Sequence, residues 1–163
     1  MVTTYAPKGK TPVLALNDTK GYQYVCVASS ISPEGKMYYE TQNKGFKGAE
    51  IVEYLKGLLQ TTERKIMLIW DNATWHKSQE VKDFLKSEIG QRLWVANTPA
   101  YSPEFNPSEL IWANLKFVQI PNSFAKNITQ LKNIVLKGMD FIAQKAGLVK
   151  SFFNLENYYF TDS

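Results

Sequence analysis

Apolar residues recur along the chain first at strand spacing and later at helix spacing. Up to about residue 41, short apolar runs alternate with turns, which predicts an antiparallel meander. The turn Ser32-Pro33-Glu34-Gly35 separates an expected strand over 22–28 from a return strand over 36–41. A shorter strand is expected over 12–16. From Phe46 onward the spacing predicts a helix with the apolar positions Ile51, Val52, Leu55, Leu58 and Leu59.

The second half of the chain alternates strands with helices. The apolar run over 65–70 predicts a central strand covered on both faces, and 93–96 predicts another strand. Between them Ser78 is placed to cap a helix that Gly90 ends. The apolar face of that helix holds Val81, Phe84, Leu85 and Ile89. This alternation predicts an α/β layered domain.

Two further helices are expected toward the end of the chain. One begins at Asn106-Pro107 and ends before Pro121, and the other runs over about 126–145. Residues 147–163 give no clear pattern. The apolar faces of the two helices hold Leu110, Ile111, Leu115 and Val118, and Ile128, Leu131, Val135, Met139 and Ile142.

Composition limits the class of protein but does not identify its partner. The length of 163 residues fits one domain, and the net charge of +4 permits nucleic-acid binding without establishing it. Of the 19 cationic residues only Arg64 and Arg92 are arginines, which favours contacts to a phosphate backbone over reading of bases. One cysteine, Cys26, excludes an intrachain disulfide. Neither a membrane span nor a signal peptide is evident, so we expect a cytoplasmic protein without a membrane partner.

Two carboxylates, Asp71 and Glu109, lie where an apolar strand ends and where a helix begins. Each has an ordinary structural explanation. Asp71 suits a turn that its own side chain closes, and Glu109 stands three residues after Asn106, the spacing of a capping box. Taken singly, each residue favours that structural role. His76 is the only histidine, so no zinc-binding set is indicated.

Together the segments around these carboxylates resemble the motifs of a known family. The run Trp70-Asp71-Asn72-Ala73-Thr74-Trp75-His76 resembles the aspartate-asparagine-alanine…histidine motif of DDE transposases. The run Tyr101-Ser102-Pro103-Glu104-Phe105-Asn106-Pro107-Ser108-Glu109, followed by Trp112 and Lys116, resembles their tyrosine-serine-proline…asparagine-proline…glutamate motif. The resemblance covers about residues 5–118 and is greatest to the bacterial insertion-sequence branch related to mariner-type elements.

The resemblance implies an RNase H-like fold, a mixed sheet flanked by helices, in which three acidic residues hold two Mg²⁺ or Mn²⁺ ions. It makes Asp71 the second acidic residue and Glu109 the third. It implies metal-dependent cleavage and transfer of DNA strands in transposition, with transposon ends and target DNA as partners. We therefore expect the cytoplasmic protein to associate with the nucleoid. Residues implied to bind DNA or position the site are Asn72, His76, Tyr101 and Lys116.

In the family, the first acidic residue ends a strand that precedes the segment matched here by residues 5–12. We therefore expect residues 1–121 to form a truncated RNase H-like core that lacks its first strand, with 122–163 as a C-terminal helical extension. Asp18, Glu34 and Glu40 lie at positions that do not favour them as substitutes. We expect the chain to be inactive or impaired without the N-terminal part of the transposase, or a second copy, as partner.

Three alternatives remain open at the level of the sequence. In the first, the chain is the catalytic-core part of a DDE transposase, a frameshift partner or a decayed copy, that is competent only when its N-terminal part is supplied. In the second, it is a non-catalytic DNA-binding remnant with the same fold. In the third, it is a different RNase H-like nuclease that draws its third carboxylate from within the chain.

Overall fold

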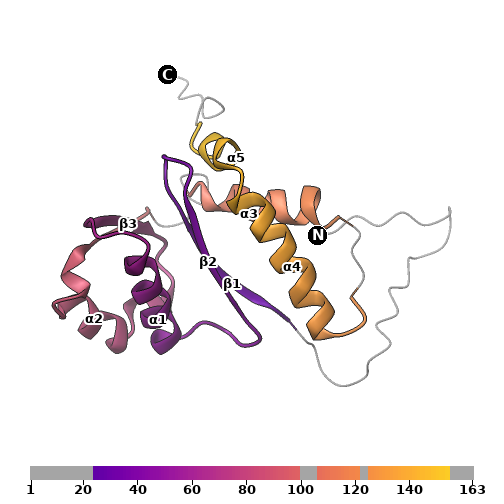
Figure 1. Cartoon of the computed structure of the whole chain (residues 1–163). Helices are drawn as coiled ribbons and strands as arrows, with labels where there is room; N and C mark the ends of the chain where they lie inside the picture. Colours follow the sequence, from indigo (N-terminus) through magenta and orange to yellow (C-terminus); the bar gives the residue numbers. More distant parts are fainter. Residues whose placement is uncertain (1–23, 100–105, 122–124, 155–163) are drawn as a thin grey trace, which may run out of the picture.

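The computed structural model describes residues 24–99, 106–121 and 125–154, which form an α/β domain (Figure 1). This class and its agreement with the RNase H-like fold confirm the expectation from the sequence. The strand expected over 12–16 lies outside the described residues. The elements are β1 (Cys26–Ile31), β2 (Met37–Gln42), α1 (Gly48–Gln60), β3 (Ile66–Trp70), α2 (Gln79–Lys86), β4 (Leu93–Asn97), α3 (Ser108–Asn114), α4 (Ile128–Ala143) and α5 (Ala146–Ser151).

β1 and β2 form an antiparallel hairpin in which Cys26 lies opposite Gln42 and Ile31 opposite Met37. The predicted turn is confirmed, and Gly35 adopts a φ of 86°, a conformation that favours glycine. The first strand lies later than its expected range of 22–28. Backbone hydrogen bonds between Ser32 and Lys36, and from Gly35 to Ser32, close the turn and extend the ladder through polar serines. Strand propensity alone does not reveal that extension.

The hairpin lies between α1 and α2 on one side and α3 and α4 on the other (Figure 1). It separates two groups of buried residues, because its side chains alternate between two faces. Ala28 and Tyr38 pack on the first core, whereas Val27 and Tyr39 pack on the second. The first core consists of Ile51, Tyr54, Leu55, Leu59, Val81, Phe84 and Leu93. The second core consists of Ile111, Leu115, Val135, Met139, Ile142, Val149 and Phe152.

Side-chain hydrogen bonds join the hairpin to helices on both sides. The hydroxyls of Ser30 and Tyr54 lie 2.7 Å apart and link β1 to α1. The Tyr39 hydroxyl donates to the Asp140 carboxylate and links β2 to α4. Burial of its phenol raises the pKa of Tyr54 above its usual value. The hairpin is therefore held in place by polar as well as apolar contacts.

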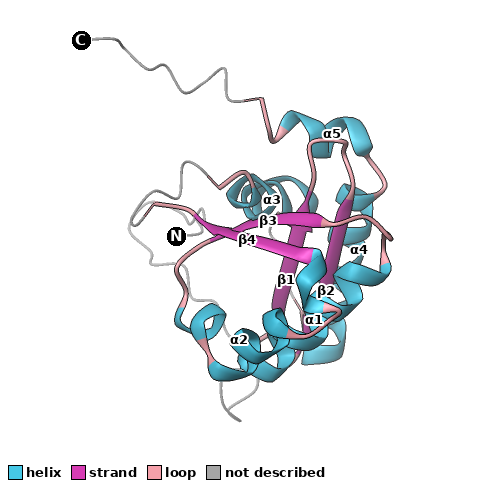
Figure 2. Cartoon of the chain, turned by 90° about the vertical axis from the view of Figure 1, so that its left-hand side faces the viewer, coloured by secondary structure: helices cyan, strands magenta, loops and turns pink. Residues whose placement is uncertain are grey.

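β3 and β4 are parallel, with Ile66 beside Leu93 and Trp70 beside Asn97. The expectation that β3 is covered on both faces is wrong. Met67 and Ile69 are 56% and 59% exposed, and the opposite face packs on the first core. A uniformly apolar strand gives no alternation from which one-sided burial could be recognised. Among the described strands, the expected mixed sheet is present as two two-stranded sheets, one antiparallel and one parallel (Figure 2).

The predicted helices are present, with corrections at their faces and ends. The Ser78 hydroxyl accepts from the Val81 amide and caps α2, as predicted, but Ile89 is exposed. The prediction that Gly90 ends this helix is wrong, because α2 ends at Lys86 and the Ser87 hydroxyl donates to the Phe84 carbonyl there. The helix from residue 108 passes into a π-helical turn over Leu115–Gln119, and Leu110 and Val118 are exposed rather than buried. The short helix α5 was not predicted.

The helices at the end of the chain complete the second core. The expected face of α4 is confirmed, with Val135, Met139 and Ile142 buried. Within the described ranges, no helix is long and apolar enough to cross a membrane. The division of the chain at residue 121 stays a prediction.

Candidate metal-binding active site

Asp71 directly follows β3, at the carboxyl end of the parallel strand pair. The Trp70 carbonyl accepts a hydrogen bond from the Thr98 amide (2.8 Å), so the chain leaving β3 is still tied to the chain leaving β4. The Asp71 side chain is 60% exposed. In α/β sheets this edge is where binding sites form, because loops from neighbouring strands meet there.

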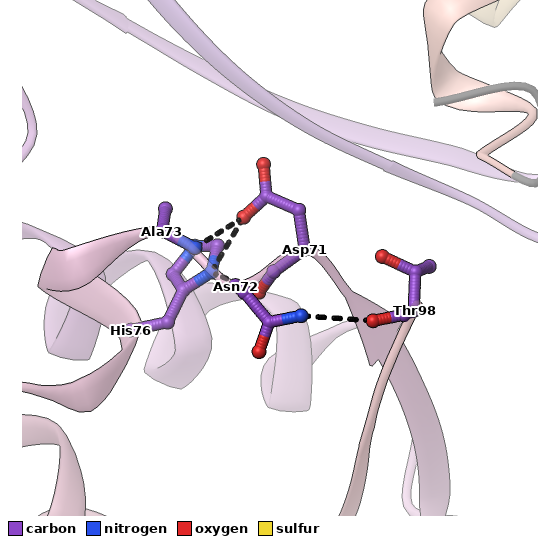
Figure 3. A network of polar contacts seen from close by, with 5 residues as sticks. All are labelled: Asp71, Asn72, Ala73, His76 and Thr98. Carbon is purple, nitrogen blue, oxygen red and sulfur yellow. Dashed lines mark hydrogen bonds and ion pairs between the residues drawn. The ribbon is translucent and has the colours of Figure 1, made fainter. Parts of the chain in front are cut away.

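The two oxygens of the Asp71 carboxylate have different surroundings (Figure 3). Oδ1 accepts from the Ala73 amide at 3.0 Å and lies 3.1 Å from Nδ1 of His76. Oδ2 has no hydrogen-bond partner within the part of the chain that the structure describes, and it points away from both residues. The side-chain-closed turn considered for Asp71 is therefore formed, but it uses one oxygen and leaves the other available.

His76 lies on a 3₁₀ turn over Thr74–Lys77, yet its side chain is only 15% exposed. Its imidazole stacks on the Trp70 indole, with centroids 4.2 Å apart and planes 4° from parallel. Nδ1 also lies 3.1 Å from the Asp71 backbone oxygen. Both atoms that Nδ1 faces are acceptors, so Nδ1 carries a hydrogen in this arrangement. His76 thus holds Asp71 rather than forming a separate site.

Asn72 joins the two loops at this edge of the sheet. Its Nδ2 donates to the Thr98 carbonyl at 2.9 Å, and Figure 3 shows its amide directed toward Thr98. This bond fixes the backbone on either side of Asp71. Asn72, His76 and Asp71 are therefore brought together, as their adjacency in the sequence suggests.

Glu109 lies in the first turn of α3 and is exposed. The Asn106 side chain accepts from the Ser108 amide at 3.1 Å, and the Asn106 carbonyl accepts from the Glu109 amide at 3.0 Å. Among the described residues, the Glu109 carboxylate accepts no hydrogen bond from the Asn106 amide. The capping box considered for Glu109 is therefore not seen there, and the Asn106 oxygens instead accept from the Ser108 and Glu109 amides. Within the described part of the chain, the Glu109 carboxylate has no hydrogen-bond partner.

Among the described residues, the remaining ones considered for the site form no hydrogen bond or ion pair with Asp71. Lys116 is exposed on the π-helical turn that follows α3. Tyr101 and Asp18 lie outside the described residues. The Glu34 carboxylate is at the tip of the hairpin, and that of Glu40 accepts from the Tyr38 hydroxyl. Within residues 24–99, 106–121 and 125–154, no three histidine, cysteine or acidic side chains are grouped to hold a metal ion.

Comparison with protein families gives a match that covers most of the chain. The family described as DDE superfamily endonuclease matches residues 2–132. The chain belongs to the DDE superfamily endonucleases. Comparisons with curated proteins and with solved structures gave no significant match. Endonucleases of this superfamily act on DNA and generally use divalent metal ions, so the acidic residues are the relevant groups to test.

The donor chemistry of Asp71 fits one ligand of such a cation in this DDE endonuclease. Mg²⁺ and Mn²⁺ prefer carboxylate oxygens, and the exposed Asp71 side chain has an oxygen, Oδ2, that is free of protein donors in the described structure. Asp71 and Glu109 lie on parts of the fold with different packing. β3 packs on the first core, whereas α3 contributes Ile111 to the second.

Two residues that support the site were not predicted from the sequence. Trp70 supplies the surface on which His76 stacks, and Thr98 receives the Asn72 amide. The role of Trp70 could have been suspected from the sequence, because an aromatic residue directly precedes the acidic residue at the strand end. The role of Thr98 could not, since its contact depends on the pairing of β3 with β4.

Proposed function

We propose that this DDE endonuclease chain is the part of a transposase that supplies Asp71 and Glu109 to a metal-dependent site for DNA strand cleavage and transfer. The observation that carries the proposal is the Asp71 carboxylate, with Oδ1 held by Ala73 and His76 and Oδ2 left exposed. An exposed oxygen on a carboxylate of fixed orientation is suited to a hard cation. The sequence motifs support assignment to an insertion sequence related to mariner-type elements.

The residues of the chain have distinct parts in this proposal. Asp71 and Glu109 would hold Mg²⁺ or Mn²⁺, which when bound would supply charge stabilisation for phosphodiester transfer. Asp71 presents Oδ2 to the cation site, while Ala73 and His76 keep Oδ1 in place. Glu109 presents a second carboxylate from the first turn of α3. Lys116 and Tyr101 contact the DNA backbone, where a lysine acts as a point charge.

We further propose that a third carboxylate completes this site from outside the described residues. The support is that the described ranges contain no group of three candidate ligands. An N-terminal part of the transposase, or a second copy, is the partner that would supply it. Without that carboxylate, Asp71 and Glu109 still bind a cation but more weakly and without the geometry that cleavage needs, so the chain alone has little or no activity.

The lack of three grouped candidate ligands in the described ranges also supports a second candidate, a non-catalytic remnant that binds DNA without cleaving it. Asp71 and Glu109 would then be structural, and neither their substitution nor the cation would change DNA binding. The two candidates make opposite statements about how activity depends on these carboxylates.

The test is nicking of supercoiled DNA in Mg²⁺ or Mn²⁺, by the chain alone and by the chain joined to the polypeptide encoded directly upstream. We expect weak or no nicking by the chain alone and metal-dependent nicking by the joined form. Asp71→Asn and Glu109→Gln should each lower the nicking rate of the joined form by at least about 100-fold, since each removes a charged metal ligand.

Asp83→Asn is the matched control, because Asp83 is an exposed acidic residue on α2 that accepts from Gln79 and lies outside the site. It should nick at the rate of the unmodified protein. If the joined form binds DNA but never nicks it, the result favours the second candidate, the non-catalytic remnant. Nicking that persists in Asp71→Asn at full rate would contradict the proposed site.

A further inference from the structure

Behind the Asp71 carboxylate lies an aromatic pair that closes the end of β3. Trp70 is the last residue of the strand, and its half-buried indole packs against the first core. The His76 imidazole lies flat on that indole, with centroids 4.2 Å apart. An aromatic partner of this kind restricts the plane of the imidazole, although His76 belongs to a short turn at the surface.

The plane of the imidazole decides where Nδ1 lies. Nδ1 is 3.1 Å from Oδ1 of Asp71 and 3.1 Å from the Asp71 backbone oxygen. The hydrogen bond of Nδ1 is with the backbone oxygen, and its contact with Oδ1 adds to the hydrogen bond that the Ala73 amide donates to Oδ1. An exposed aspartate without such contacts would sample several rotamers, whereas these two contacts keep Oδ2 directed away from Ala73 and His76 (Figure 3).

The backbone that carries the indole is fixed as well. The Trp70 carbonyl accepts from the Thr98 amide, and the Thr98 carbonyl accepts from the Asn72 side chain. These bonds tie the residues before and after Asp71 to the end of β4. Trp70 is therefore a rigid support, and the imidazole is the movable group between it and the carboxylate.

We propose that Trp70 is a positioning residue, which orients the Asp71 carboxylate toward a divalent cation through its stack on His76. The inference rests on the proposed function in one respect, that a cation binds Asp71. Without a flat ring at position 70, His76 turns away and Oδ1 loses its close contact with Nδ1. Partners of metal ligands typically change metal affinity about 10–100-fold, and we expect the lower end because Ala73 still donates.

The test compares three tryptophan substitutions. Trp70→Leu keeps apolar volume but removes the ring, and Trp70→Phe restores a flat ring. Trp94→Leu is the matched control, because Trp94 is a tryptophan on the adjacent strand β4 that is 72% exposed and outside the network. Mn²⁺ affinity is measured from the electron paramagnetic resonance signal of free Mn²⁺, and Asp71→Asn defines the background.

We expect Trp70→Leu to weaken Mn²⁺ binding about tenfold, Trp70→Phe to recover most of the affinity and Trp94→Leu to leave it unchanged. His76 is the only histidine of the chain, so its ring protons give unambiguous nuclear magnetic resonance signals. Loss of the stacked indole should move these signals downfield in Trp70→Leu. The shift reports the stack without any metal present.

A second substitution tests whether Trp70 acts through His76. His76→Phe keeps a flat ring on Trp70 but removes the donor, so it should lose the same tenfold in affinity. Trp70→Leu should then add little in the His76→Phe background. If Trp70→Leu loses the circular-dichroism spectrum of the fold, His76→Phe alone tests the donor and Trp70→Phe tests the ring.

The inference is overturned if Trp70→Leu binds Mn²⁺ as tightly as the unmodified protein. It is equally overturned if Trp70→Leu causes its full loss in the His76→Phe background, or if His76→Phe binds normally. A failure of the proposed function looks different: the unmodified protein would bind Mn²⁺ no better than Asp71→Asn, and both claims would then fall.

Discussion

Two glutamates near helix starts have opposite surroundings. Oε2 of Glu50 accepts from the Lys47 amide at 3.2 Å, and its carboxylate also forms an ion pair with Lys44. Glu109 forms no comparable bond to Asn106 among the described residues. Spacing from Asn106 predicts Glu109 as a capping residue, but it does not show whether the glutamate side chain turns back to the backbone amide. That difference makes Glu109 available for chemistry and Glu50 structural.

At Glu50 the structure predicts a pH dependence of folding. The hydrogen bond from Lys44, followed by backbone donors, holds the pKa of Glu50 below its ordinary value of 4.5. A lowered pKa in the folded state means stability that is present above pH 4.5 and lost as the pH falls through the folded value. Urea unfolding over this acidic range should show a smaller loss for Glu50→Gln than for the unmodified protein.

Glu53→Gln is the control, since Glu53 lies on the same helix and pairs with Lys56 at the surface. Its unfolding free energy should follow the pH profile of the unmodified protein. Identical profiles for Glu50→Gln and the unmodified protein would contradict the role given to Glu50.

Among the elements, periodic patterns predicted the helices well and the exposure of their faces less well. The apolar positions of α4 proved buried, and Ser78 caps α2 as predicted. The face of the helix after residue 106 was predicted only in part. Ile111 and Leu115 are buried, but the π-helical turn has a wider spacing than an α-helix, so Val118 departs from their face. No local pattern in the sequence marks such a turn.

Adjacent positions in α3 give a direct test of this correction. Ile111 is fully buried in the second core, whereas Leu110 is exposed. Ile111→Ala should lower the free energy of unfolding by about 2–5 kcal/mol, because it leaves a cavity, and Leu110→Ala by less than about 1 kcal/mol. Chemical denaturation of both variants measures the difference. Equal losses would show that the face of α3 has been misplaced.

Across the whole molecule, the α/β class was predictable, but the position of the hairpin was not. β1 and β2 separate the two cores, yet the serines in β1 hide the alternation that would indicate burial on both faces. The candidate site shows the same limit. Asp71, Asn72 and His76 are close in sequence and were predicted together, whereas the placement of Glu109 depends on the packing of α3 far along the chain.

The proposed metal site depends on a cation bound at Asp71. The family match assigns the chain to the DDE superfamily endonucleases, and Asp71 is the carboxylate whose orientation is held by Ala73 and His76. His76 lies against Asp71 and is the only histidine, so its ring protons are a local probe for a paramagnetic ion.

The most direct test is therefore a Mn²⁺ titration of the unmodified protein and of Asp71→Asn, followed through the proton signals of the His76 ring. If Mn²⁺ binds at Asp71, these signals broaden at low Mn²⁺ concentration in the unmodified protein and stay sharp in Asp71→Asn. Equal broadening in the two proteins, or none in the unmodified protein, would contradict a metal site at Asp71.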